Sequence, residues 1–188
     1  MNIPLHFAPC FARCTWRRRE NRKMSNLTIR KPGLDEAEQL AKMLCEDEVL
    51  RADLGMSKDH RPTADDFLKK LADWCPPRRA TTYAILAGDR AVGTISISYR
   101  DPASQSAQIG YWVGSRYRRR GYASRAFAAI LAQAASEGIA SVSATVATGN
   151  TPSRRLWEHY GSTATATDAG KLRYRLDLNA NTRVVSTP

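Results

Sequence analysis

Two periodicities of hydrophobic and polar residues follow one another in the middle of the chain. From Gln108 to Val113, side chains alternate with a period of two in a stretch rich in aromatic and β-branched residues, which predicts a strand. From Ala123 onward, the apolar positions follow the period of a helix and lie on one face: Ala123, Ala126, Phe127, Ile130, Leu131 and Ala134. The pattern therefore predicts a central strand that leads through a short turn into an amphipathic helix.

The same two periodicities predict further strands and helices before and after this unit. Strands are expected at 27–30, 83–86, 92–99 and 142–146, with a closing antiparallel pair at 162–167 and 172–178 around a turn at 168–170. Helices are expected at 35–45, 64–74 and from 151 to the stop at Gly161, while 46–62 is expected to be irregular and polar. Thr63 and Thr151 are predicted N-caps, Pro152 the first helical residue, and Gly138 the end of the central helix.

These elements predict a single α/β (α+β) domain over residues 24–180. Residues 1–23 are basic and show no clear period, so we expect a disordered extension with Met24 as the true start, the alternative being a targeting or nucleic-acid arm. Residues 181–188 are expected to form a tail. No apolar run approaches the length of a membrane span, so no membrane partner is expected.

Charge and cysteine content narrow the possible partners and the compartment. The net charge is +11, and residues 1–23 supply +5 of it through six Lys and Arg and one Glu. An anionic partner is indicated, with a nucleotide cofactor and nucleic acid both open on charge alone. The four cysteines lack metal-ligand spacing, which predicts no metal, reduced thiols and a cytoplasmic location.

The turn between the central strand and helix has the features of an anion site. It holds three consecutive arginines, Arg118, Arg119 and Arg120, and then Gly121. A glycine allows close approach of the backbone, and the N–H groups of a helix's first turn lack intrahelical acceptors and attract negative charge. A pyrophosphate is the expected ligand, although a run of basic residues by itself also fits a solvent-exposed charged surface or an RNA-binding surface.

Two spaced motifs give this site a family resemblance. The run from Arg118 to Ala123 fits Arg/Gln-x-x-Gly-x-Gly/Ala, and Asn150, Ser153 and Gly161 fit a second Asn-x-x-Ser motif after a strand. Together they resemble the acetyl-coenzyme A (acetyl-CoA) site of the GNAT superfamily of N-acetyltransferases. The phrase IGYWVGSRYRRRGYASRA is most similar to the branch that contains ribosomal-protein N-terminal (alanine) acetyltransferases.

The resemblance implies a fold and a set of cofactor contacts. It implies a mixed, mostly antiparallel twisted sheet of about six or seven strands with about four helices, splayed past a bulge at the cofactor strand. The main chain of Tyr111, Trp112 and Val113 would pair with the pantetheine arm, and the turn would take the pyrophosphate. The cofactor residues it implies are Tyr111, Trp112, Val113, Arg118, Arg119, Arg120, Gly121, Tyr122, Ala123, Ser124, Asn150 and Ser153. Residues 46–75 would help to choose the acceptor.

The acid–base residues depart from the family pattern. Relatives often carry Glu where Gln108 or Thr145 stands, and Tyr as general acid where Trp157 stands. Gln108 can position a water, and Ser153 or Tyr160 can substitute for the missing acid, with only Ser153 expected on the same helix face as Trp157. These three, Gln108, Ser153 and Tyr160, are the catalytic candidates. Loop residues that could serve as bases are Glu48, Asp53, His60 and Asp101.

Two classes of function follow from these observations. The first is an acetyl-CoA-dependent N-acetyltransferase that passes the acetyl group directly to a primary amine, on a protein N-terminus or a small molecule. The second is a catalytically weak CoA-binding protein of the same fold, or a basic RNA-binding module. The intact cofactor motifs favour the enzyme and disfavour nucleic acid, whereas the missing carboxylates keep the second class open; a homodimer is also left open.

Overall fold

The computed structural model describes residues 27–57, 59–167 and 170–179. The expected extension at 1–23, the first part of the predicted turn at 168–170 and the expected tail at 181–188 lie outside these residues. The elements run β1 (Leu27–Arg30), α2 (Leu34–Glu46), α3 (Glu48–Asp53), α4 (Ala64–Trp74), η2 (Pro76–Arg78), β2 (Thr81–Ala87), β3 (Arg90–Asp101), β4 (Ser106–Val113), η3 (Ser115–Tyr117), α5 (Tyr122–Ser136), β5 (Ser141–Ala147), α6 (Thr151–His159), β6 (Thr163–Ala166) and β7 (Lys171–Asp177).

The strands form one mixed sheet in the order β1-β2-β3-β4-β5-β7-β6. Every neighbouring pair is antiparallel except β4 and β5, which run parallel because α5 forms the crossover between them. The predicted α/β class and mostly antiparallel sheet are confirmed.

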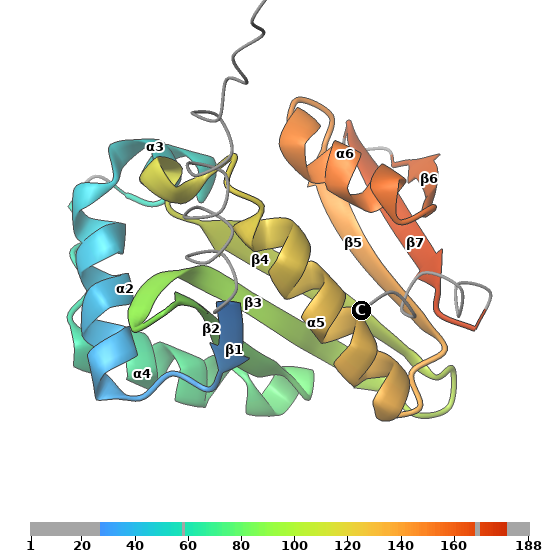
Figure 1. Cartoon of the computed structure of the whole chain (residues 1–188), viewed down its shortest axis with the longest axis horizontal. Helices are drawn as coiled ribbons and strands as arrows, with labels where there is room; N and C mark the ends of the chain where they lie inside the picture. Colours follow the sequence, from blue (N-terminus) through green and yellow to red (C-terminus); the bar gives the residue numbers. More distant parts are fainter. Residues whose placement is uncertain (1–26, 58, 168–169, 180–188) are drawn as a thin grey trace, which may run out of the picture.

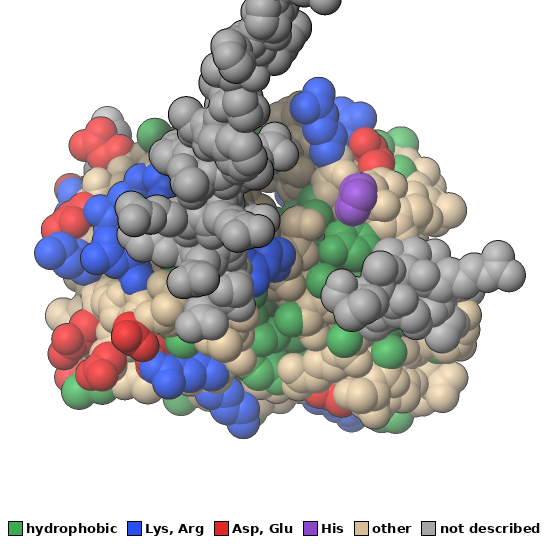
Figure 2. Space-filling model, viewed as in Figure 1, with side chains coloured by type: hydrophobic (Ala, Val, Ile, Leu, Met, Phe, Trp, Pro, Cys, Tyr) green, Lys and Arg blue, Asp and Glu red, His purple; other side chains and the backbone are tan. Residues whose placement is uncertain are grey.

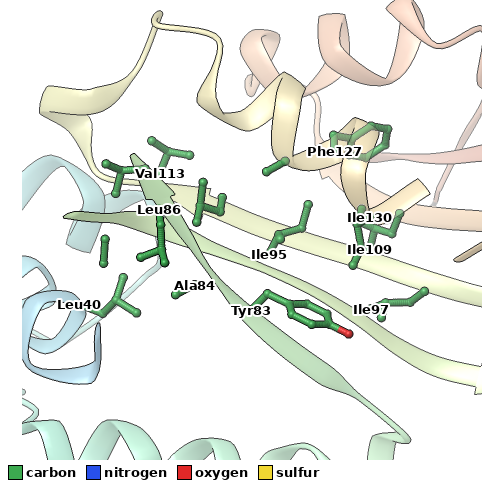
Figure 3. Packing of buried hydrophobic residues seen from close by; sticks show 14 of the residues in the cluster. Leu40, Tyr83, Ala84, Leu86, Ile95, Ile97, Ile109, Val113, Phe127 and Ile130 are labelled. Carbon is green, nitrogen blue, oxygen red and sulfur yellow. The ribbon is translucent and has the colours of Figure 1, made fainter. Parts of the chain in front are cut away.

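Helices cover the N-terminal part of the sheet on both faces. In Figure 1, α5 crosses in front of the strands, while α2 and α4 lie beside each other at the opposite side. Figure 3 shows Phe127 and Ile130 of α5 above the sheet residues Ile95 and Ile109, with Leu40 of α2 approaching from the far side. Five of the six predicted apolar positions on α5 are buried, and Ala123 is half-buried. This stripe is core, as its period predicts.

The parallel strands β4 and β5 pair over only three residues and then diverge. The pairs are Ser106 with Ser141, Ala107 with Val142 and Gln108 with Ser143. The predicted splay is therefore present. The register shift found in the pairing of β4 lies on β3, between Ser98 and Asp101, where Tyr99 has a positive φ of 50°. The splay leaves the last five residues of β4 beyond the last pair with β5.

The segment predicted to be irregular contains a helix, which corrects that prediction and raises the helix count to five in the described chain. Asp47 is the N-cap of α3, since its side chain accepts the Leu50 N–H at 3.0 Å. The helix buries Leu50 and Arg51 against the rest of the domain. A six-residue helix shows too little periodicity to be read from sequence.

The predicted N-cap of α6 is also wrong by one residue. Asn150, not Thr151, caps this helix, because its Oδ1 accepts the Ser153 N–H at 3.2 Å. Thr151 is then the first helical residue and Pro152 the second. Asn is the stronger cap, but Pro is favoured at the first helical position, which Pro152 would occupy if Thr151 were the cap. The predicted cap at Thr63 is confirmed, with its Oγ1 accepting the Asp66 N–H at 3.1 Å.

Membrane and thiol predictions can be compared with the described part of the chain. Among its helices, none combines the length and the apolar character that crossing a bilayer requires. Cys45 and Cys75 are free thiols. Cys10 and Cys14 lie outside the described residues.

Candidate active site

The divergence of β4 from β5 exposes the main chain of one strand inside the molecule. Tyr111, Trp112 and Val113 follow the last parallel pair, so their main-chain groups on this side are not used by β5. On the other side they remain paired with Ile95, Thr94 and Gly93 of β3. The strand thus presents a row of donors and acceptors to an extended ligand, as an edge strand does.

The turn after β4 brings backbone N–H groups to the start of α5. Gly121 is the N-cap in a left-handed conformation with φ 76°, and an added Cβ there would meet nothing within 4 Å. Arg119 is also left-handed, with φ 60°, an unusual conformation for a residue with a side chain. The first turn, from Tyr122 through Ser124, carries no acidic residue. Its N–H groups and the exposed Arg119 and Arg120 make a concave, electropositive site suited to phosphate.

Arg118 differs from the other two arginines because its side chain is engaged. Its guanidinium forms an ion pair with Asp53 at 2.8 Å, and its Nε donates to the Val113 carbonyl at 3.2 Å. Asp47, at the other end of α3, accepts the Ser115 N–H at 2.6 Å. Burial opposes ionisation of Asp47, but the N–H groups of Leu50 and Ser115 outweigh it and lower its pKa. The helix missed by sequence analysis therefore braces the turn.

The opposite wall of the gap is the start of α6. The Ser153 hydroxyl and the Tyr111 hydroxyl are hydrogen bonded at 2.8 Å, so a side chain of β4 reaches across the gap. Burial raises the pKa of Tyr111 and the bond to Ser153 partly opposes this, so the phenol is protonated at neutral pH. Asn150 uses its Oδ1 for the cap, which leaves its Nδ2 as a donor. On the face seen in Figure 2, Lys and Arg side chains gather over α6.

An aromatic cluster holds Trp157 of α6 and Tyr160, the residue that caps the end of this helix. Trp157 is fully buried, with its ring 4.9 Å from Phe127 and stacked on Tyr174 at 6.2 Å. Tyr160 packs on Phe127 at 5.1 Å, and its hydroxyl donates to the Ser124 carbonyl at 3.2 Å. Trp157 is thus core, and Tyr160 fastens α6 to the first turn of α5. Of the three candidates, Ser153 has its hydroxyl in the gap.

The remaining sequence candidates lie apart from one another. Gln108 is exposed on β4 at the last pair with β5, and Thr145 is exposed on β5. Asp101 is held in its turn by the Ala103 N–H and the Ser104 hydroxyl. Of the four loop residues considered as bases, His60 is the one that lines the large pocket described next.

A pocket of about 1060 Å³ lies beside the C-terminal half of β4. Its wall on the sheet includes Gly110, Tyr111 and Trp112, and its other walls come from α4 and the segment 54–62. Both apolar and charged side chains line it, including Phe67, Leu71 and Trp74 among the former. The exposed end of β4 therefore lies between the turn at Gly121, which is suited to phosphate, and a pocket large enough for a second substrate.

A buried arginine fixes the wall of this pocket. Arg51 is 5% exposed, and its guanidinium donates to the carbonyls of Leu44 at 2.7 Å, His60 at 2.8 Å and Ser57. These bonds tie Ser57 and His60 to α2 and α3. Arg51 belongs to no recognisable motif, so its role could not be predicted from the sequence. Asp47, three residues before Leu50, could have been predicted as an N-cap, because Asp is a favoured cap residue.

No group of three or more potential metal ligands occurs within the described ranges of the chain. The groups at β4 and the turn after it are main-chain amides, hydroxyls and cationic side chains, a set suited to a phosphate-bearing ligand.

Comparison with known proteins agrees with this arrangement. The profile described as acetyltransferase (GNAT) domain matches residues 26–163, well over half of the chain. Comparison with curated proteins gives no match. The profile ends at the start of β6, although β7 pairs with β5 along its whole length and belongs to the same sheet.

Solved structures share the fold at low sequence identity. RimJ of Mycobacterium smegmatis, in complex with CoA-disulfide, is 22% identical with a TM-score of 0.69, covering 83% of this chain and 84% of that one. RimL, a ribosomal L7/L12 alpha-N-protein acetyltransferase in complex with CoA, is 18% identical with a TM-score of 0.69 and coverages of 83% and 96%. A spermidine N-acetyltransferase from Vibrio cholerae, in complex with CoA and spermine, is 12% identical with a TM-score of 0.68 and coverages of 82% and 97%. With both motifs in place and the domain profile matched, the chain belongs to the GNAT acetyltransferase family, whose co-substrate is acetyl-CoA.

Proposed function

We propose that this protein is an acetyl-CoA-dependent N-acetyltransferase that transfers the acetyl group directly to a primary amine, on a protein N-terminus or a small molecule. The observation that carries the proposal is the position of β4. Its exposed main chain continues into the Gly121 turn at one end and forms a wall of the 1060 Å³ pocket at its side. A cofactor along β4 would therefore present its acetyl group to that pocket.

The cofactor contacts divide between main chain and side chains. Main-chain groups of Tyr111, Trp112 and Val113 would pair with the pantetheine amides and supply an N–H to the thioester oxygen. The turn from Arg118 and the first helical residues Tyr122, Ala123 and Ser124 would hold the pyrophosphate. Arg118 would contribute through its main chain because its guanidinium is bound to Asp53, whereas Arg119 and Arg120 are exposed. Asn150 would donate its Nδ2 to the pantetheine.

Transfer needs a proton donor for the departing sulfur. The amine nitrogen forms a bond to the thioester carbon, the carbon–sulfur bond breaks, and the electron pair leaves with the sulfur as a thiolate. We assign the proton donor to Tyr111 and Ser153, whose hydroxyls are bonded at 2.8 Å at the gap. The attacking nitrogen loses its own proton to water or to His60, which lines the pocket. Tyr160 would act by positioning, and Gln108 by holding a water.

Calorimetric titration of the full chain with acetyl-CoA tests the cofactor site. Micromolar binding is expected, together with loss of affinity by about 100-fold or more in Gly121→Asp, which places a negative charge where the phosphates belong. Gly121→Asn is the matched control. Asn has nearly the same shape and tolerates a positive φ, so the difference between the two variants isolates the charge.

A second control separates binding from folding. Gly138 also has a positive φ, 77°, and lies just beyond the far end of α5. Gly138→Asp introduces the same side chain and similar strain away from the turn, so it should lower the melting temperature while acetyl-CoA affinity stays unchanged. Equal losses in both Asp variants, or the absence of binding in the unmodified protein, would exclude the assignment, and the arginine turn would then be tested for salt-dependent RNA binding.

A further inference from the structure

The pocket beside β4 carries an excess of positive charge. Its lining includes four permanent cations, from segment 54–62, α4 and η2, and two carboxylates, both on α4. The cations are Arg61, Lys69, Lys70 and Arg78, and the carboxylates are Asp66 and Asp73. Charge of one sign along a cleft concentrates ligands of the other sign.

One of the two carboxylates is already engaged. Asp66 belongs to a capping box: its Oδ2 accepts the Thr63 N–H at 2.9 Å and the Thr63 hydroxyl at 2.8 Å. These bonds hold the carboxylate at the N-terminus of α4, where the helix dipole also attracts it. An incoming ammonium group would have to compete with them for Asp66, and the four cations of the lining still outnumber its two carboxylates.

Arg78 is the cation whose position is most firmly fixed. Its guanidinium carbon lies 5.2 Å from the ring centre of Trp74, and its Nη1 donates to the Trp74 carbonyl at 3.2 Å. Its Nε donates to the Tyr99 hydroxyl at 3.2 Å. An arginine held on an aromatic ring keeps further N–H donors for a carboxylate and loses little freedom when one binds.

The size of the pocket indicates what kind of anion it takes. A volume of about 1060 Å³ is at the upper limit of pockets for small molecules, which reach about 1,000 Å³. The cations are also spread over three segments of the chain rather than gathered at one point. A single small carboxylate would engage one of these groups, whereas a short extended chain with several acidic groups would engage most of them.

We propose that the acceptor amine is the N-terminus of an acidic polypeptide, bound with its first residues in this pocket and its carboxylates against Lys69, Lys70 and Arg78. The assignment rests on the proposed acetyl transfer and names its acceptor class. The positive charge of the pocket disfavours a polyamine such as spermidine as acceptor, because spermidine is itself positively charged. The two Lys residues and Arg78 are then specificity determinants rather than catalytic residues.

The test compares acceptors at a fixed, saturating concentration of acetyl-CoA with the full chain. Release of the free thiol is measured for a short acidic peptide, the same peptide with Lys in place of its acidic residues, free glutamate and spermidine. The acidic peptide is expected to have a kcat/KM about tenfold or more above each of the others, with the advantage falling as salt rises. Preference for spermidine or the Lys peptide would overturn the assignment of an acidic acceptor, but not the proposed acetyl transfer. Equal kcat/KM for free glutamate and the acidic peptide would overturn the assignment of a polypeptide acceptor. No transfer to any amine would overturn the proposed function as well.

Charge reversal shows whether the pocket is responsible. Lys70→Glu should lower kcat/KM for the acidic peptide about tenfold through KM, and raise it for the Lys peptide. Lys31→Glu makes the same change of charge at an exposed position that does not line the pocket, and should leave both values unchanged. Acetyl-CoA affinity should be the same in both variants. Equal losses in the two variants would assign the effect to net charge and overturn the role of the pocket.

Discussion

The two sides of the candidate site are built in different ways. The proposed cofactor side consists mainly of main-chain groups on β4, the Gly121 turn and the first turn of α5, which follow one another in the sequence, with Asn150 added from the start of α6. The acceptor side consists of side chains from α4, η2 and the irregular segment 54–62, held in place by a buried arginine. Main-chain recognition suits a constant ligand, whereas a wall of side chains can change its specificity without disturbing the cofactor. A substitution that disturbs one side should therefore weaken binding on that side and leave binding on the other side unchanged.

The largest effect is expected from Arg51, whose hydrogen bonds hold the wall of the acceptor side. Arg51→Met leaves three carbonyls without their donor, so we expect a loss of about 3 kcal/mol of unfolding free energy and a KM for the acceptor raised about tenfold or more. Arg51→Lys should retain part of this stability, because an ammonium group can still reach some of the carbonyls. Denaturant unfolding and steady-state kinetics measure the two effects. An equal loss of acetyl-CoA affinity would show that the two sides do not behave separately.

A somewhat smaller effect is expected where the two sides meet. Tyr111→Phe and Ser153→Ala each remove one hydroxyl of the 2.8 Å pair. If the pair supplies the proton, kcat should fall about 10- to 100-fold in each, and the double variant should lose little more than either single one. The calorimetric Kd for acetyl-CoA should stay the same. Independent, additive losses would show that the hydroxyls do not act together.

A third effect concerns the aromatic cluster behind the cofactor side. Trp157 is fully buried between Phe127 and Tyr174, so a tyrosine there would not reach the reacting sulfur. Trp157→Tyr should therefore reduce stability by about 2 kcal/mol without raising turnover. Trp157→Phe is the control that lacks the hydroxyl. Higher turnover in the Tyr variant than in the Phe variant would show that this position can supply the acid.

The smallest effect is an acid sensitivity of the helix that supports α4. Glu36 is buried at the start of α2, and its pKa is lowered first by the Gly33 N–H and then by the paired Arg30. A group whose pKa is lower in the folded protein stabilises it above the ordinary glutamate pKa, about 4.3, and this contribution is lost as the pH falls further. Glu36→Gln should cost about 1 kcal/mol at neutral pH, and its deficit against the unmodified protein should shrink towards pH 3. A deficit constant across this range would mean that the charge is not responsible.

The contrast between the two sides also explains what the sequence could predict. The turn around Gly121 depends on a local conformation that few residues other than glycine adopt, so it leaves a readable motif. All seven strands and the long helices follow from periodicity, and the mixed, mostly antiparallel sheet follows from the resemblance. The contacts of Arg51 and Arg118 join segments that only the tertiary structure brings together, and neither residue type signals its partner. The cap of α6 was predicted one residue too late because Pro152 would be the first helical residue after a Thr151 cap, although Asn is the stronger cap.

The short pairing of β4 with β5 gives this molecule a sheet edge in its interior. Edge strands tend to recruit strands of other chains, and an exposed row of amides on a central strand would ordinarily invite aggregation. Here the start of α6 lies beside this edge, with the hydroxyls of Tyr111 and Ser153 hydrogen bonded at 2.8 Å. The same geometry makes every second amide of β4 beyond Gln108 exchange with solvent hydrogen as at an edge, until a bound ligand arm takes the place of the missing strand.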